Sequence, residues 1–139
     1  MDYKEAYAMA LRLLNVRFLS EGELRKKLKA KEAGPDICDA VLDKLKSERF
    51  IDDERLATEV FRLYARKQQY GRRYIVNRLR MRSLPVPEET EPLDELATAA
   101  GLVEKRFSRG AADPRKIARF LQYRGFSPGV ISEIIGHVE

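Results

Sequence analysis

The stretch that decides the fold reads Ser20-Glu21-Gly22-Glu23-Leu24-Arg25-Lys26-Lys27-Leu28. A serine followed three residues later by a glutamate is a capping box, in which each side chain accepts a hydrogen bond from the other residue's backbone N–H. Leu24 and Leu28 lie one turn apart on the same helix face, whereas the basic residues face solvent. The stretch therefore predicts an amphipathic helix that begins at Ser20 and ends before Gly34.

Flanking segments complete a three-helix unit. Apolar residues at helical spacing, among them Ala6 and Ala10, predict a helix over residues 2–16. Pro35 suits the first turn of a third helix, because its missing N–H would be unpaired there anyway. Val41, Leu42 and Leu45 supply the apolar face of that helix.

The unit recurs twice along the chain. Leu24 and Leu28 match Ile75 and Leu79, 51 residues later, and then Ile117 and Leu121, a further 42 residues on. An alanine lies 18 residues before the first member of each pair: Ala6, Ala57 and Ala99. Such units bury little core alone and stack on their neighbours. The sequence predicts an all-α protein of three tandem three-helix repeats in an elongated, curved arrangement.

The predicted repeats cover residues 1–51, 52–92 and 93–139. Asp52 is expected to cap the first helix of the second repeat, and a second helix is expected over residues 72–82. Residues 83–92 hold three prolines among acidic residues, which predicts a linker and a degraded third helix. Helical character resumes at Leu93, and further helices are expected over 114–123 and 128–137, separated by a left-handed stop at Gly125.

Composition narrows the class of protein. With 139 residues, 44% hydrophobic and 35% charged, the chain resembles neither a disordered nor a disulfide-stapled protein. The single Cys38 cannot form an internal disulfide, and we expect it to be a small core residue. No secretion signal or membrane span is recognisable, so we expect a cytoplasmic protein. The formal net charge of +5 favours a polyanion or an acidic surface as partner.

Residues that could carry chemistry have structural explanations. Asp52 and Asp53 form an adjacent carboxylate pair, but both suit the start of a helix, and Phe50 and Ile51 are expected to anchor the joint between repeats. His137, the only histidine, has no neighbouring ligand cluster in the sequence. Neither a phosphate-binding glycine loop nor a nucleophile with its base is recognisable. We expect no enzyme activity, no catalytic residue, no metal site and no cofactor.

Basic residues supply the candidate binding site. Between Glu59 and Glu88 no acidic residue interrupts the positive side chains, and Tyr64, Tyr70 and Tyr74 lie among them. Arginine and lysine release counterions when they bind phosphates, and aromatic rings can stack on bases. Smaller basic groups occupy the second helix of the first and third repeats. The predicted binding residues are Arg25, Lys27, Lys31, Arg62, Arg66, Lys67, Arg72, Arg73, Arg78, Arg82, Arg119 and Arg124.

Several motifs together resemble the RecX regulatory family. They are Arg17 with Ser20 and Glu23-Leu24-Arg25-x-Lys27-Leu28, then Phe50-Ile51-Asp52-Asp53-x-Arg55-x-Ala57, then Gly71-Arg72-Arg73-x-Ile75, and finally Phe120-Leu121-x-x-Arg124-Gly125-Phe126-Ser127 with Ile131. The resemblance spans nearly the whole chain. It implies three three-helix repeats, binding to RecA and to its filament on single-stranded DNA, and inhibition of recombinase, ATPase and coprotease activity, and so a role in DNA repair, recombination and the SOS response.

Three positions depart from the family pattern. Ser83 and Leu84 stand where the family usually has a glycine and a branched apolar residue, and Leu56 stands where an aromatic residue is frequent. We expect these changes to be structural and to affect the angle between the second and third repeats.

Three hypotheses follow for function. The first is a monomer that docks a basic strip into the RecA filament, with single-stranded and also double-stranded DNA as partners. The second is a stand-alone helical nucleic-acid-binding module. The third is a helical scaffold whose basic face meets an acidic protein.

Stacking of the predicted repeats has a measurable consequence in solution. Small-angle X-ray scattering should give a radius of gyration well above the ~14 Å of a compact domain of this length. A value near that of a compact domain would contradict the stacked arrangement.

Overall fold

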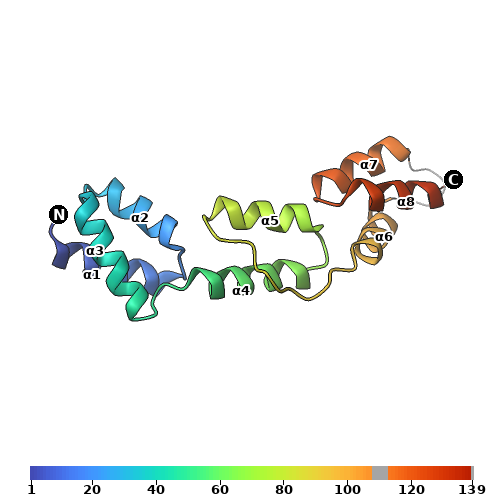
Figure 1. Cartoon of the computed structure of the whole chain (residues 1–139). Coiled ribbons are helices and arrows are strands. Elements are labelled where there is room, and N and C mark those ends of the chain that lie inside the picture. The colour runs from blue at the N-terminus through green and yellow to red at the C-terminus, as the bar shows by residue number, and fades with distance from the viewer. Residues whose placement is uncertain (108–112, 139) are drawn as a thin grey trace. The chain divides into compact units, whose positions relative to one another are not determined.

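The computed structural model of the chain describes residues 1–107 and 113–138, with side chains up to Gly136, and the regular secondary structure in this range is entirely helical (Figure 1). The described helices are α1 (Tyr3–Val16), α2 (Glu21–Ala30), α3 (Pro35–Ser47), α4 (Asp53–Arg66), α5 (Arg72–Met81), α6 (Glu95–Arg106), α7 (Pro114–Tyr123) and α8 (Pro128–Val138). None of them combines the length and the apolar composition that a membrane crossing needs. The predicted all-α class is confirmed.

Side-chain caps start α2 and α4 where the sequence predicts. The capping box at α2 is complete: Glu23 N–H donates to Ser20 Oγ over 3.0 Å, and Ser20 N–H donates to Glu23 Oε1 over 2.9 Å. Asp52 caps α4 by accepting from the Arg55 N–H at 3.1 Å. The prediction that helical structure resumes at Leu93 is wrong by two residues, because Asp94 caps the helix by accepting from the Ala97 N–H.

Residue contacts group the chain into two compact units. The first unit comprises Met1–Glu59 and Leu79–Pro87. In it α1, α2 and α3 pack against one another around a core that includes Leu24, Leu28 and Leu42 (Figure 1). Cys38 is fully buried in this core, as predicted. Ile51, the last residue of the first predicted repeat, is buried in the same core.

Phe50 does not anchor the joint between repeats, so that prediction is wrong. Its side chain is 48% exposed. Arg49 adopts a left-handed backbone, with φ of 62°, and the Phe50 N–H donates back to Leu45 O at 2.9 Å. This hydrogen bond fixes the Phe50 backbone at the end of α3 while its ring stays at the surface.

The second unit comprises Val60–Arg78 and Glu88–Glu139. Within it α6 and α7 both pack on α8, around a core formed by Ala99, Ile117, Leu121, Phe126 and Ile134. The borders between the units fall inside α4 and inside α5. The repeat boundaries drawn from the sequence stay a prediction.

The second helix of every repeat ends in the same way. The second residue beyond each of these helices has a left-handed backbone: Glu32 has φ of 65°, Ser83 of 58° and Gly125 of 87°. The next N–H then reaches back to the last turn, with Ala33 donating to Leu28 O, Leu84 to Leu79 O and Phe126 to Leu121 O at 2.9–3.1 Å. These are Schellman motifs, which satisfy carbonyls that the helix itself leaves free. The predicted left-handed stop at Gly125 is confirmed.

Each unit contains a joint, where the start of the second helix of one repeat meets the end of the second helix of the next repeat. In the first joint the Ser20 hydroxyl, at the start of α2, donates to Arg82 O at 2.5 Å, just beyond α5. In the second joint the Gly71 N–H, at the start of α5, donates to Arg124 O at 2.8 Å, just beyond α7. The same sequence offsets of 51 and 42 residues relate the two joints.

Close approach at the joints requires a glycine on one side. A Cβ on Gly22 would lie 2.6 Å from Ser83 Cβ, which real atoms do not tolerate. The second joint has a glycine on each side: a Cβ on Gly125 would meet the Tyr74 backbone and lie 2.6 Å from Tyr74 Cβ, and a Cβ on Gly71 would meet Gly125 O. Gly22 therefore makes room for the serine that replaces the usual glycine at position 83.

This pairing predicts a rescue experiment. Gly22→Ala should lower the free energy of unfolding by about 1–3 kcal/mol through overpacking. In a Ser83→Gly background the same change should cost much less, because the opposing Cβ is gone, which gives a coupling above about 0.5 kcal/mol. Urea unfolding of the four proteins in this cycle measures the coupling.

Gly101 offers the matched control for the rescue experiment. A Cβ there meets nothing within 4 Å, and the residue lies inside α6. Gly101→Ala should therefore stabilise the protein by up to about 1 kcal/mol through helix propensity. Additive effects of the Gly22 and Ser83 changes would contradict the steric account.

An ion pair reinforces the first joint. The Arg82 guanidinium donates to Glu23 Oε1 at 3.0 Å and to Phe18 O at 2.9 Å. Partial burial alone would raise the pKa of Glu23, but hydrogen bonds from Arg82 and from the Ser20 N–H outweigh it. The pKa of Glu23 is therefore held below its ordinary value of 4.5.

The lowered pKa of Glu23 predicts acid sensitivity of the first joint. A carboxylate whose pKa is lower in the folded state stabilises the protein above the unfolded pKa and loses that effect as pH falls through the folded value. Glu23→Gln should cost about 1–3 kcal/mol at neutral pH. The difference from the unchanged protein should shrink as pH falls below 4.5.

Thermal unfolding across this pH range provides the measurement. The exposed pair between Arg55 and Glu59, at 3.3 Å, serves as control, and Glu59→Gln should cost less than about 0.5 kcal/mol. A Glu23→Gln difference that stays constant with pH would contradict a role for the ionised carboxylate.

Candidate nucleic-acid interface

The structure distributes the twelve predicted binding residues over both units. Four belong to the first unit: Arg25, Lys27, Lys31 and Arg82. Eight belong to the second unit and are called the basic surface below: Arg62, Arg66, Lys67, Arg72, Arg73, Arg78, Arg119 and Arg124. All of the eight are exposed except Arg124, which is partly buried.

Two of the four predicted binding residues in the first unit form ion pairs. Arg82 bonds Glu23 in the joint, and Arg25 pairs with Asp39 at 2.8 Å and with Glu21 at 3.9 Å. The hydrogen bond to Asp39 raises the pKa of Arg25. Within the described residues, no side chain of the basic surface forms an ion pair. The basic surface therefore keeps its charge available for an external anion.

Three tyrosines form one cluster beside this basic surface. The rings of Tyr70 and Tyr74 stack with centroids 4.0 Å apart and 5° between their planes. Tyr64 meets both rings edge-on, at 5.8 and 6.1 Å. Lys67 lies over the Tyr64 ring at 5.2 Å. The tyrosines that the sequence places among the basic residues are thus brought together by α4, α5 and the turn between them.

Arginines cover the outer faces of the stacked rings. Arg78 lies 5.0 Å from the centre of Tyr74, and Arg124 lies 5.5 Å from that of Tyr70. Arg124 also lies 5.2 Å from the centre of Phe120, which Arg106 approaches at 5.3 Å. Because the rings are only 4.0 Å apart, no guanidinium fits between them. These groups form an arginine–aromatic column: Arg78, Tyr74, Tyr70, Arg124, Phe120 and Arg106.

The column determines what a ligand meets at this surface. A guanidinium stacked on a ring keeps its N–H edge free for hydrogen bonds, and that edge matches the oxygens of a phosphate or carboxylate. A hydrogen bond to the Tyr74 hydroxyl, 2.9 Å long, raises the pKa of Arg78. Burial and the neighbouring Tyr74 raise the pKa of Tyr70, against the opposing effect of Arg124. Tyr70 therefore stays neutral beside Arg124, and the guanidinium groups give the column a positive charge.

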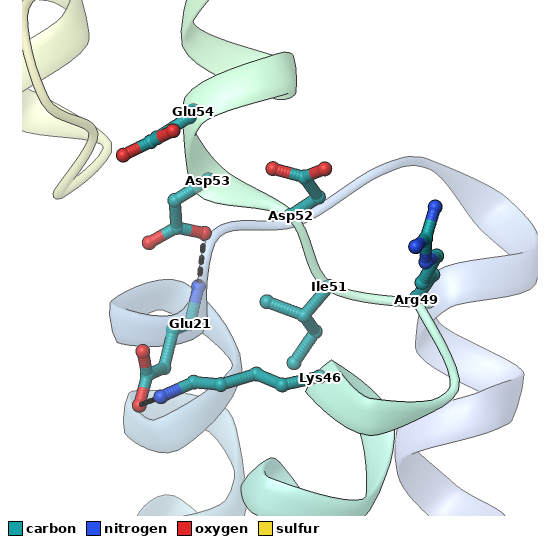
Figure 2. Close-up of a pocket in the computed structure, with 7 residues that line it drawn as sticks. All are labelled: Glu21, Lys46, Arg49, Ile51, Asp52, Asp53 and Glu54. Carbon is teal, nitrogen blue, oxygen red and sulfur yellow. Dashed lines mark hydrogen bonds and ion pairs between the residues drawn. The ribbon is translucent and has the colours of Figure 1, made fainter.

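The carboxylate pair Asp52–Asp53 has structural partners. Figure 2 shows the two side chains pointing in different directions, with Asp53 accepting from the Glu21 N–H at 2.9 Å. Lys46 pairs with the Glu21 carboxylate at 2.8 Å. Burial raises the pKa of Asp53, although the hydrogen bond from Glu21 opposes this effect. Asp53 thus ties the start of α4 to the start of α2, which supports the structural interpretation.

Sequence reasoning missed two parts of this arrangement. Glu95 accepts from the Arg72 N–H at 2.9 Å, and thereby repeats, one repeat later, the bond that Asp53 accepts from the Glu21 N–H. The offsets of 42 and 51 residues could have revealed this equivalence. Arg106 and Phe120 were not recognised as members of the column. Phe120 lies one helical turn before Arg124, so this spacing could have revealed their contact, whereas only tertiary packing brings Arg106 of α6 to Phe120.

No cluster of three or more histidine, cysteine or acidic side chains suited to a metal occurs in the described part of the chain. The side chain of His137 lies outside the described residues.

Comparison with known proteins places the arrangement in a family. Residues 6–45 match the sequence profile "RecX, first three-helix domain", and residues 94–135 match "RecX, third three-helix domain". The chain is 33% identical to "Regulatory protein RecX" of Leptothrix cholodnii over 134 residues, covering 91% of this chain and 84% of the relative. It is 35% identical to the protein of that name from Thermus thermophilus over 129 residues, covering 93% and 89%.

A solved structure agrees in fold. The crystal structure of RecX from Lactobacillus salivarius superposes with a TM-score of 0.83 at 23% identity, covering 99% of this chain and 96% of that one. The motifs, the helical repeats and the identity over most of both chains lead to one conclusion. The chain belongs to the RecX family of regulatory proteins.

Proposed function

We propose that this protein binds the RecA filament on single-stranded DNA and inhibits its recombinase, ATPase and coprotease activities. The observation that carries the proposal is membership of the RecX family, whose curated relatives are named regulatory proteins. The resemblance of the sequence motifs to that family implies RecA as the partner. The protein would act by occupying the filament and not by chemistry of its own.

The basic surface supports this proposal. A filament on DNA presents phosphates, and eight basic residues without a carboxylate partner in the described structure suit such a ligand. The arginine–aromatic column adds guanidinium groups whose orientation is fixed by stacking, so less side-chain freedom is lost on binding. Arg25, Lys27, Lys31 and Arg82 would extend the contact from the first unit.

The proposal includes the setting in which the protein works. We place it in the cytoplasm as a monomer, where RecA, single-stranded DNA and also double-stranded DNA are its partners. Within the proposed mechanism, a bound monomer either blocks entry of the second duplex or favours shortening of the filament. Electron microscopy of filaments with and without the protein separates these two routes by filament length.

A second candidate function is stand-alone binding of nucleic acid. The arginine–aromatic column favours it, because guanidinium groups over aromatic rings suit phosphates whether or not a recombinase is present. In that case the protein would bind naked DNA tightly and leave RecA activity unchanged.

Reversal of charge on the basic surface tests the proposal. The triple variant Arg66→Glu, Arg72→Glu and Arg73→Glu should abolish inhibition of RecA-dependent ATP hydrolysis and strand exchange, because phosphate contacts become repulsive. The three side chains are exposed, so circular dichroism should show unchanged helix content. The unchanged protein should inhibit at stoichiometric amounts.

The control carries the same change in net charge elsewhere. Lys4→Glu, Lys44→Glu and Arg49→Glu alter exposed residues of the first unit that lie outside the predicted site, and this variant should retain inhibition. Full inhibition by a folded basic-surface variant would move the interface elsewhere. No inhibition by the unchanged protein, together with tight binding of naked DNA, would support the stand-alone function instead.

A further inference from the structure

An apolar groove lies on the first unit, formed by the second half of α1 and the chain segments that follow α1 and α3. Its apolar lining consists of Leu11, Leu14, Val16, Phe18 and Phe50. The volume of the groove is about 730 Å³, within the range of ~300–1,000 Å³ that ligand pockets span. Val16 is 83% exposed and Phe18 68%, so this surface is open to solvent.

Comparison between repeats shows that the fold does not require these apolar side chains. Val16 and Phe18 correspond to Lys67 and Gln69 at the offset of 51 residues. The backbone makes the same contact at both places. Phe18 O accepts a hydrogen bond from Arg82, and Gln69 O accepts one from Arg124. A polar side chain is therefore compatible with the joint. Exposed apolar side chains gathered in one place indicate an interaction surface.

Charge around the groove indicates what kind of partner fits. Arg12 and Arg17 are the charged residues among those that line it, and no carboxylate lines it. Arg17 pairs with Glu23 at 3.1 Å but keeps much of its side chain exposed, and Arg12 forms no ion pair with a described residue. The rim is therefore positive, and the complementary ligand is negative.

We propose that this groove docks an acidic segment of a partner protein that carries Leu- or Phe-like anchors. Aliphatic and aromatic anchors would fill the space over Leu11, Leu14 and Phe18, and carboxylates beside them would meet Arg12 and Arg17. A lining of aliphatic side chains with few hydrogen-bond donors suits a protein segment better than a row of phosphates. The site is separate in sequence from the basic surface, so it does not depend on the proposed function.

Fluorescence anisotropy with the full chain tests the proposal. The probe is a labelled helical peptide with Leu and Phe on one face and Glu on the other. Two matched peptides carry Lys in place of Glu, or Ser in place of Leu and Phe. We expect saturable binding of the first peptide and roughly tenfold weaker binding of the other two, the size expected from losing one buried anchor or the charge match.

Variants locate the binding on the protein. The double variant Val16→Ser, Phe18→Ser should bind the acidic peptide more weakly, by roughly tenfold or more. Its stability should be nearly unchanged, because both side chains are mostly exposed. Arg12→Glu should reverse the preference between the acidic and the basic peptide. Tyr123→Ser removes an aromatic side chain that is 83% exposed on the second unit, and it should have no effect.

Three outcomes would overturn the proposal. The first is no saturable binding of the acidic peptide, or binding that the Val16 and Phe18 changes leave intact. The second is loss of oligothymidylate binding in the same double variant, which would assign the groove to nucleic acid. The third is a dimer in sedimentation of the unchanged protein that the double variant dissociates, which would assign the groove to a second copy. Inhibition of RecA is not a readout of these tests, so their failure leaves the proposed function standing.

Discussion

Both units of this protein depend on one contact, the meeting of two helix ends at a joint. A helix leaves N–H groups free at its start and carbonyls free at its end, and buried groups of this kind must find partners. In each unit, a group at the start of the second helix of one repeat donates a hydrogen bond to the carbonyl just beyond the second helix of the next repeat. The Ser20 hydroxyl donates to Arg82 O, and the Gly71 N–H donates to Arg124 O. The distance is short enough that one side must lack a Cβ, and an acidic residue of the following repeat supports the joint. The glycines and the acidic caps at the joints are consequences of this contact.

The same joints help to explain where the basic residues are free to bind. Arginines that follow the second helices serve the fold: Arg82 is bound to Glu23, and Arg124 bonds Gln69 O while it stacks on two rings. The basic-surface residues on α4 and α5 form no ion pair with a described residue, so they retain their charge. In a member of the RecX family, this division leaves one chain of modest net charge with eight basic side chains in the second unit that form no ion pair with a described residue. Ion pairs neutralise part of the first unit but none of the basic surface in the described structure.

The proposed polar and apolar binding surfaces belong to different repeats of one pattern. At equivalent positions the first repeat has Val16 and Phe18 where the second has Lys67 and Gln69. The backbone contact made there is the same, so the side chains were free to diverge. A repeat protein can in this way attach a hydrophobic contact to one unit and an electrostatic contact to another. The first adds affinity through burial of apolar area, and the second adds rate and salt dependence.

Local patterns in the sequence determined the helices, their caps and the left-handed stop at Gly125, because these depend on residues within one or two turns of each other. The recurrence of these patterns at offsets of 51 and 42 residues determined the repeat. They also located the basic run and the family resemblance. Only the tertiary structure showed that Asp53 caps another helix, that Gly22 accommodates Ser83, that Phe50 is exposed, and that Arg106 and Phe120 join Tyr70 and Tyr74 in one column. These features join residues tens of positions apart, and spacing along a chain carries no information on which distant side chains meet until the helices have packed.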